Sequence, residues 1–370
     1  MERLVASGVE PAPQPRPCLA DISLYDPGRT PCEVDLSDNT NRWGVPPAAA
    51  RVLAATPESA VTRYPSPYAA ALVQALAAAA GVDADDVVTG CGSDDVLDST
   101  LRAFCAPGDR VAFAAPTFGM VPLFARGGDA RPVAVPLRGE LSLDEDALAD
   151  AGATVTYLCR PNNPTGTLFP RAAVERIASR LAGLLVVDEA YVDFAGSGED
   201  LGSWAAASRN VVVLRTLSKA YGLAGLRVGY AVGPPALVAA IAKARGPYKV
   251  GGVAEAAALA ALAGDGDWVR QQVALAVQAR ATLAAALGER DFAVLPSAAN
   301  FVFVPLPPNC GGAVAVAAAL RARGVAVRPF AGLPVVGDGL RVTVGPSPLL
   351  DRFLAELAAV AAQWPRVEEA

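Results

Sequence analysis

The chain of 370 residues contains no histidine. A Ser-His-Asp triad, a histidine-ligated metal site and a histidine general base are therefore excluded. Chemistry that depends on a lysine amine does not need a histidine.

Cysteine is also sparse. The six cysteines are scattered along the chain without a Cys-x-x-Cys pair, and no histidine is present to complete a zinc site with them. We expect them to be reduced and structural, including Cys91, which lies in a glycine-rich turn.

Long runs of one charge and long apolar runs are missing too. The net charge is −6 with acidic and basic residues interspersed, which argues against nucleic acid or an anionic membrane as a partner. Alanine-rich helical segments such as 69–80 are too short to span a bilayer. The N-terminal segment is proline-rich and has no apolar signal core, so we expect a cytoplasmic protein.

The most informative segment that is present is TLSKAYGLAGLR at 216–227. It sets Lys219 among small hydroxyl residues and glycines, eight residues before Arg227. A lysine amine can form a Schiff base with the aldehyde of pyridoxal 5'-phosphate, while hydroxyls and a guanidinium bind the phosphate. We therefore expect Lys219 to be the covalent anchor and Thr216, Ser218 and Arg227 to be phosphate ligands.

Two upstream segments could serve the same cofactor. VVDEAY at 186–191 has the pattern of a buried strand that ends in an acid and a phenol, and PNNPTG at 161–166 is a turn after an apolar strand. Asp188 would pair with the ring nitrogen and keep it protonated. Tyr191 and Asn163 would hydrogen-bond the phenolic oxygen of the ring.

Each of these residues also has a simpler interpretation. Lys219 would be a solvated loop lysine, Asp188 a helix cap or salt-bridged strand end, and Asn163 a turn residue. Each simpler interpretation suffices for one residue, but the joint arrangement favours a cofactor site.

With these motifs the chain resembles the fold-type I pyridoxal-phosphate aminotransferases, and within them the histidinol-phosphate aminotransferase-like group. The resemblance runs from about residue 25 to about residue 353. Its most specific pieces are PNNPTG, VVDEAY and TLSKAYGLAGLRVGY.

The resemblance implies further cofactor contacts. The turn with Gly92, Ser93 and Asp94 precedes a helical pattern, and the free N–H groups there would bind the cofactor phosphate. Phe118 would stack on the ring where the family usually has tyrosine, although core packing is the simpler interpretation. Tyr64 would cross a dimer interface to the partner's cofactor phosphate, so the active site would need two subunits.

Substrate recognition is expected near the C-terminus. Arg341 lies in the apolar strand pattern 340–344, where a buried guanidinium is costly unless it pairs with an anion. The resemblance implies that Arg341 binds the substrate carboxylate or phosphate, assisted by Arg328, Tyr25 and Asn41. A structural salt bridge is the alternative for both arginines.

The order of elements predicts an α/β fold. Apolar runs alternate with helical patterns between about residues 86 and 245, which predicts a three-layer α/β/α domain with a mostly parallel sheet and a ligand at the strand carboxyl ends. A smaller α+β domain should follow. The expected strands are 110–114, 131–136, 154–159, 184–188 and 211–215, and then three within 300–305, 325–330 and 340–344. The expected domains are an N-terminal arm at 1–45 joining the small domain, a large cofactor-binding domain at 46–264 and a small substrate-closing domain at 265–370.

The resemblance implies an aminotransferase that acts through Lys219 as a homodimer. L-Histidinol phosphate, or a similar amine or amino acid, would be the donor and 2-oxoglutarate the acceptor. An aromatic amino acid is an alternative donor, and a threonine-phosphate decarboxylase-like enzyme shares the architecture. A catalytically silent binding protein is a third alternative, against which the intact Lys219, Asp188 and Arg227 argue. The sequence NTNR at 39–42 lacks the acid and the proline of the family's Asn-Glu-Asn-Pro, so the substrate pocket should differ there.

Overall fold

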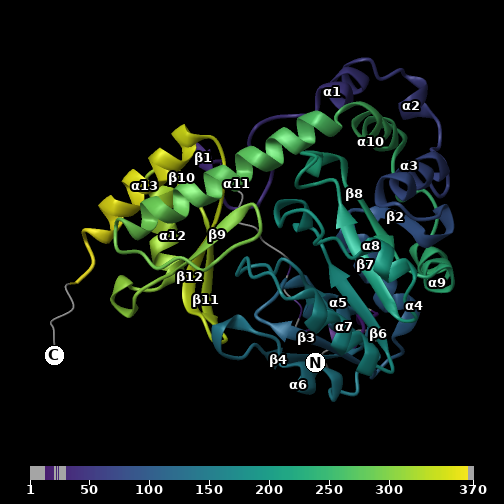
Figure 1. Cartoon of the computed structure of the whole chain (residues 1–370), viewed down its shortest axis with the longest axis horizontal. Helices are drawn as coiled ribbons and strands as arrows, with labels where there is room; N and C mark the ends of the chain where they lie inside the picture. The colour runs from purple at the N-terminus through teal and green to yellow at the C-terminus, as the bar shows by residue number, and fades with distance from the viewer. Residues whose placement is uncertain (1–12, 21, 23, 25–30, 366–370) are drawn as a thin grey trace, which may run out of the picture.

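A seven-stranded sheet forms the centre of the larger part of the structure (Figure 1). The computed structural model describes residues 13–20, 22, 24 and 31–365. Five neighbouring strands are parallel, and β8 runs antiparallel to both of its neighbours. In spatial order the strands are β2 (Val87–Cys91), β8 (Val228–Val232), β7 (Val211–Thr216), β6 (Leu184–Asp188), β5 (Val155–Cys159), β3 (Arg110–Ala115) and β4 (Arg131–Pro136). The mostly parallel sheet expected from the sequence is confirmed.

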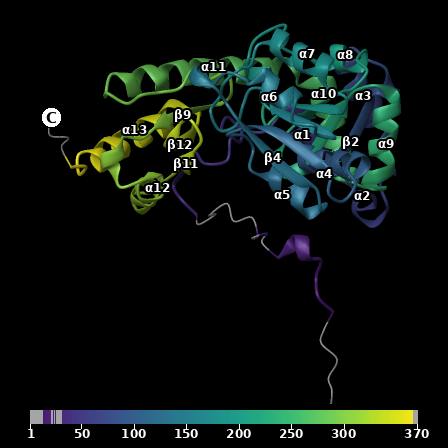
Figure 2. The ribbon, with the colours of Figure 1, turned by 90° about the horizontal axis from the view of Figure 1, so that it is seen from below.

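Helices cover both faces of this sheet, because its central strands are apolar on both sides. Two separate apolar clusters fill the two sides, and Figure 2 shows the helix layers on either side. One layer contains α4 (Ser93–Phe104), α5 (Met120–Gly127) and α9 (Pro235–Arg245). The other contains α6 (Glu145–Ala149), α7 (Arg171–Arg180) and α8 (Gly202–Ala206).

A further group of helices packs near β2 and β8 through a third apolar cluster. It consists of α1 (Pro47–Ala54), α3 (Ala70–Ala80) and α10 (Gly252–Gly264), with the short α2 (Ser59–Thr62) against α10. Short 3-10 helices also occur at η1 (Pro17–Leu19), η2 (Ala84–Asp86), η3 (Gly139–Leu141), η4 (Val192–Phe194), η5 (Ala224–Leu226) and η6 (Pro308–Cys310).

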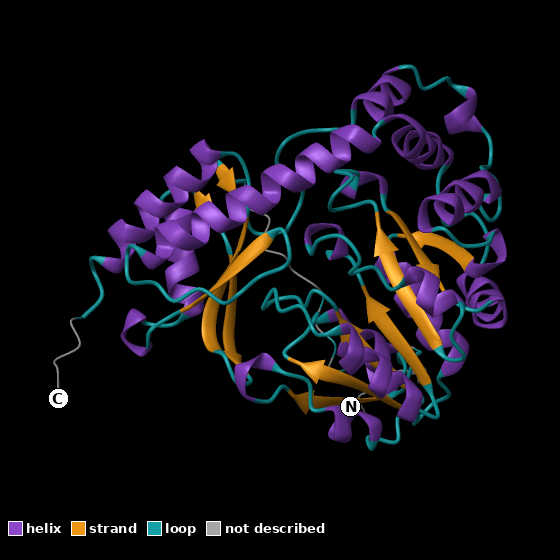
Figure 3. Cartoon of the chain, viewed as in Figure 1, coloured by secondary structure: helices purple, strands orange, loops and turns teal. Residues whose placement is uncertain are grey.

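The smaller part of the structure is built on two further sheets (Figure 3). One is antiparallel, with the order β11 (Arg328–Leu333), β12 (Gly337–Thr343) and β9 (Phe301–Pro305). In the other, β1 (Val34–Asp35) pairs in parallel with β10 (Val325–Ala326). The helices of this part are α11 (Gly266–Gly288), α12 (Ala313–Ala322) and α13 (Ser347–Ala361). The β1–β10 pairing therefore brings the N-terminal segment to the C-terminal part of the chain.

Two features of this fold bear on the site. The carboxyl ends of the parallel strands β5, β6 and β7 meet at one edge of the large sheet, which is where ligands bind in such sheets. Across the residues that the structure describes, every helix is too short or too polar to cross a membrane.

Candidate active site

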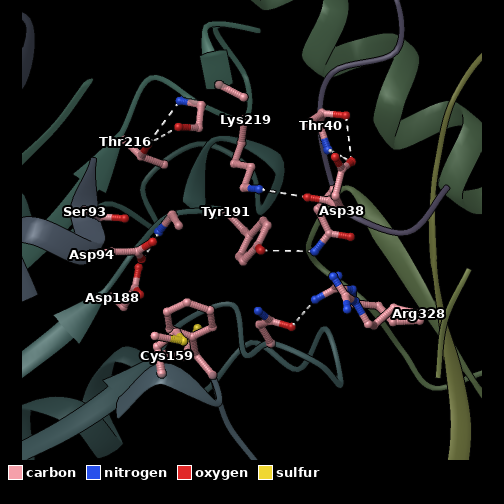
Figure 4. Close-up of a pocket in the computed structure, with 18 of the residues that line it drawn as sticks. Asp38, Thr40, Ser93, Asp94, Cys159, Asp188, Tyr191, Thr216, Lys219 and Arg328 are labelled. Atoms are coloured by element: carbon pink, nitrogen blue, oxygen red, sulfur yellow. Dashed lines mark hydrogen bonds between the residues drawn. The ribbon is translucent and has the colours of Figure 1, made fainter. Parts of the chain in front are cut away.

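A cavity of about 740 Å³ lies at the carboxyl ends of β5, β6 and β7 (Figure 4). Residues of β11 and β12 also line it, so both parts of the structure contribute to one site. The lining residues that the sequence had singled out are Ser93, Asp94, Phe118, Asn163, Asp188, Tyr191, Thr216, Ser218, Lys219, Arg227, Arg328 and Arg341.

Lys219 lies in the loop after β7 and extends its amine into the cavity (Figure 4). Its Nζ donates a hydrogen bond to the backbone oxygen of Asp38 at 3.1 Å and lies 5.7 Å from the centre of the Tyr191 ring. Burial, and next the nearby Arg341 guanidinium, lowers the pKa of the Lys219 amine to about 8. A substantial fraction is therefore neutral just above physiological pH, and a neutral amine can act as a nucleophile or a base.

Asp188 ends β6 on the floor of the cavity and is only 6% exposed. Its Oδ2 accepts a hydrogen bond from the Tyr157 hydroxyl at 2.7 Å, and its Oδ1 accepts one from the Ala190 N–H at 3.0 Å. Burial raises the pKa of Asp188 to about 6, and these two hydrogen bonds oppose that rise. The carboxylate is therefore mostly charged at neutral pH and is suited to a cationic group in the cavity.

Hydroxyl groups and a helix N-terminus gather at another part of the lining. Ser93 is the first residue of α4, whose first N–H groups have no partner within the helix. The Thr216 and Ser218 hydroxyls are hydrogen-bonded to each other at 2.9 Å. Together these groups can donate several hydrogen bonds to a phosphate.

Arg227 adds a positive charge beside this helix N-terminus. Its backbone is left-handed, with a φ of 53°, a conformation that costs a non-glycine residue of order 1 kcal/mol. Its Nη2 lies 3.8 Å from the Asp94 carboxylate. Gly92 has a φ of 82°, which favours glycine, and a Cβ there would displace the end of the Arg227 side chain. A strained residue that lines a cavity is typical of a functional site.

Two arginines of the smaller part lie opposite each other in the lining. Arg328 on β11 and Arg341 on β12 are direct cross-strand partners. Arg341 is buried, and it donates to the Asn163 side-chain oxygen at 2.7 Å and to the Ser37 backbone oxygen at 2.6 Å. Like charges directly opposite on neighbouring strands are unfavourable unless other groups compensate them.

Asn39 connects the N-terminal segment to both parts of the structure. Its Nδ2 donates to the Tyr191 hydroxyl at 3.0 Å, and its Oδ1 accepts from the Thr343 hydroxyl at 3.1 Å. The Asn39 backbone oxygen accepts from Asn300 Nδ2 at 2.9 Å. These bonds fix Tyr191 in the cavity wall.

Some of the expected site residues lie elsewhere. Asn41 does not line the cavity. Its side chain donates a hydrogen bond to the Ala220 backbone oxygen and accepts one from the Trp43 N–H. Asn39, two residues earlier, does line the cavity. Gly92 also lies outside the lining, behind Arg227.

Tyr64 is not among the residues that line the cavity. Tyr64 is 86% exposed, and its ring lies 5.1 Å from that of Tyr248. Its expected role requires a second subunit. Tyr25 lies outside the described residues.

The sequence patterns missed other residues of the site. Asp38, Met120 and Cys159 line the cavity, and Tyr157 supports Asp188 from behind. Strand alternation could have indicated Tyr157, because residues two apart on a strand point to the same face. Cys159 lies two residues after Tyr157 and pairs in register with Asp188.

The donor set fits pyridoxal 5'-phosphate. Hydroxyls, the α4 N-terminus and Arg227 suit a phosphate, and the buried Asp188 carboxylate suits a protonated ring nitrogen. Lys219 lies in the same cavity with a lowered pKa, as attack on an aldehyde requires.

Comparison with known proteins agrees with this donor set. The family model described as aminotransferase class I and II matches residues 32–357. An aromatic amino acid aminotransferase of Nocardia farcinica is 40% identical and a histidinol-phosphate aminotransferase of Erythrobacter litoralis is 37% identical, each over 94% of this chain and 98% of the relative. The crystal structure of a histidinol-phosphate aminotransferase from Sinorhizobium meliloti in complex with pyridoxal-5'-phosphate superposes with a TM-score of 0.85 at 28% identity, covering 94% of this chain and 97% of the other. The chain therefore belongs to the class I and II aminotransferases, of fold type I, and its cofactor is pyridoxal 5'-phosphate.

Proposed function

We propose that the enzyme transfers the amino group of L-histidinol phosphate to 2-oxoglutarate. The observation that carries this proposal is the pairing of Arg328 and Arg341 directly across β11 and β12 in the cavity wall. A phosphate monoester carries almost two negative charges and several acceptor oxygens, so it can bind both guanidiniums at once. The name of the Erythrobacter litoralis relative supports the same donor.

A second candidate donor is an aromatic amino acid. The Nocardia farcinica relative, which is 40% identical to this chain, is an aromatic amino acid aminotransferase. Such a donor would bring one carboxylate to Arg341 and an apolar ring to the side of Phe118. A carboxylate carries less negative charge than a phosphate monoester, so the aromatic donor would interact less strongly with Arg328.

The proposed roles follow from the positions of the side chains. Bound pyridoxal 5'-phosphate supplies an electron sink for the negative charge that develops on the substrate Cα. Lys219 would hold the cofactor covalently and, once released, would remove the Cα proton and return a proton on the product side. Asp188 would keep the ring nitrogen protonated, and Asn163 and Tyr191 would orient the ring.

The remaining residues would bind the ends of cofactor and substrate. Ser93, Thr216, Ser218 and Arg227 would hold the cofactor phosphate. Arg341, already 2.7 Å from Asn163, would present the substrate anion to the same side of the ring.

We also propose a homodimer with Tyr64 at its interface. Several large apolar side chains are exposed around the segment that carries Tyr64, and such a patch typically marks an interface. They include Val61 at 75%, Tyr64 at 86%, Tyr68 at 50% and Tyr248 at 45% exposure. The Tyr64 hydroxyl would then reach the cofactor phosphate of the partner subunit.

The boundaries proposed for the domains are 1–45, 46–264 and 265–370. The long helix α11 begins near the last boundary and runs across to the smaller part (Figure 1). Pairing of β1 with β10 supports an arm that moves with the small domain. Closure of that domain over substrate would exclude water around Arg341. A cytoplasmic location stays a prediction.

The lowered pKa of Lys219 predicts how cofactor uptake depends on pH. Only the neutral amine attacks an aldehyde, so the uptake rate of the cofactor-free protein should rise with pH and level off above about 8. An ordinary lysine amine would level off near 10.5. Stopped-flow absorbance of cofactor mixed with protein from pH 6.5 to 10 measures the midpoint. A midpoint above about 10 would contradict the buried environment of Lys219.

The donor is tested by mixing the cofactor-loaded protein separately with histidinol phosphate, phenylalanine and threonine phosphate in single turnovers. We expect histidinol phosphate to convert the bound cofactor to its pyridoxamine form fastest. Faster conversion by phenylalanine would establish the aromatic donor instead. Release of carbon dioxide from threonine phosphate, without conversion of the cofactor, would replace transamination with decarboxylation.

A further inference from the structure

Asp188 receives its hydrogen bonds from fixed groups of the chain. One donor is a backbone N–H, at Ala190, and the other is the Tyr157 hydroxyl, 2.7 Å from Oδ2. A short O–H···O⁻ bond to a charged acceptor is among the stronger hydrogen bonds in proteins. The chain has no histidine that could donate to Asp188.

Tyr157 is held rigidly in place for this contact. It is fully buried in the centre of β5, within the apolar cluster on one face of the large sheet. Its strand pairs in register with β6, with Tyr157 opposite Val186 and Cys159 opposite Asp188. Tyr157 and Asp188 are therefore diagonal neighbours on the same face, and the hydroxyl reaches the carboxylate without entering the cavity lining.

We propose that Tyr157 is a positioning residue for Asp188: its hydroxyl orients the carboxylate toward the cofactor ring and stabilises its charged form. This inference rests on the proposed contact between Asp188 and the ring nitrogen.

The electrostatic surroundings make this hydrogen bond necessary. Burial raises the pKa of Asp188 to about 6, and the Tyr157 bond is the largest influence that opposes it. Other ionisable groups also face Asp188: Asp94 from α4 raises the pKa, Lys219 lowers it, and Cys159 and Tyr191 interact with it. Without the Tyr157 donor, the proton would move onto Asp188 near neutral pH, and a neutral carboxyl group no longer holds a protonated ring nitrogen.

The test compares Tyr157→Phe with a matched control, Thr156→Val. Phenylalanine keeps the buried ring and removes only the hydroxyl. Thr156 directly precedes Tyr157 in β5 and is equally buried. Its hydroxyl has no hydrogen-bond partner within the part of the chain that the structure describes. Both variants therefore lose one buried hydroxyl from the same strand. Thermal melting of each protein shows whether the fold is retained.

Each protein is loaded with cofactor labelled with ¹⁵N at the ring, and the ¹⁵N chemical shift is followed with pH. In the wild type we expect the shift of a protonated ring at pH 7. Tyr157→Phe should lose part of that protonation at pH 7, and the acidic limb of kcat/KM should move up by about one pH unit, a tenfold change in the proton equilibrium. Thr156→Val should match the wild type in both measurements.

Three outcomes distinguish the proposed role of Asp188 from that of Tyr157. Wild-type protein whose ring nitrogen is not protonated would overturn the role of Asp188 itself. A protonated wild type with an unchanged Tyr157→Phe variant would overturn the inference about Tyr157 alone. If Tyr157→Phe does not fold, site-specific 3-fluorotyrosine at position 157 keeps the ring and strengthens the donor, so the acidic limb should move down. No downward movement would then reject the proposal.

Discussion

Replacing Lys219 by alanine should lower kcat by about 10⁴-fold, because in the proposed mechanism one side chain would serve as covalent anchor and as general acid and base. The cavity should remain intact, since among the residues that the structure describes the Lys219 amine donates one hydrogen bond, to the Asp38 backbone. Steady-state kinetics with each donor measure the loss. Cofactor should still bind, but weakly and without a covalent link.

The lysine content of the chain makes the attachment site easy to identify. The three lysines are Lys219, Lys243 and Lys249. Reduction of the loaded protein with borohydride, followed by peptide mapping, should place the cofactor on Lys219. Lys243→Ala, at an exposed position of α9, is the matched control and should keep full activity. Cofactor on Lys243 or Lys249, or wild-type rates in Lys219→Ala, would refute the assignment.

Replacing Arg341 by alanine should have the next largest effect. Arg341 and the substrate anion would form a buried charge pair in the proposed mechanism. Loss of one partner of such a pair costs about 2–5 kcal/mol, which is roughly 30- to 4,000-fold in kcat/KM. Arg341→Lys should recover only part of this loss, because an ammonium cannot form the bidentate contact of a guanidinium. KM and kcat for the donor, with melting temperature as a check on folding, measure the effect.

Arg328→Ala is the companion variant that distinguishes the donors. If the donor carries a phosphate, kcat/KM should fall by about tenfold or more, because one of two charged hydrogen-bonding groups is lost. With an aromatic amino acid as substrate the same variant should change little. Equal and small effects of Arg328→Ala and Arg341→Ala on every donor would contradict an anion site between β11 and β12.

Strand periodicity predicted most of the large sheet well. All five predicted strands of that sheet agree with the structure to within one residue at each end. These strands are buried on both faces, so their apolar runs are continuous and end at clear turn signals. Strand β2 was not predicted, because a glycine interrupts it and a turn follows at once. Strand β8 was quoted within the lysine motif but was not recognised as a strand antiparallel to both of its neighbours.

Local sequence also indicated the chemistry of the cavity floor. The segments around Asn163, Asp188 and Lys219 each combine a strand end with a polar side chain, and parallel strands bring such ends to one edge. The role expected for Asn41 stays a prediction: its side chain bonds to the Ala220 and Trp43 backbones, while Asn39 lines the cavity. Both asparagines lie in the four-residue segment NTNR, so the sequence alone did not indicate which of them lines the cavity.

The sequence by itself therefore determined the exclusion of histidine and the parallel sheet and predicted the lysine chemistry, because these depend on residue identity and local periodicity. Only the tertiary structure decided which distant groups meet. Arg328 faces Arg341 through strand register, Asp38 accepts a bond from Lys219 across 181 positions, and Tyr157 supports Asp188 across 31 positions. Contacts of this kind arise from the pairing and packing of whole elements, which no local pattern records.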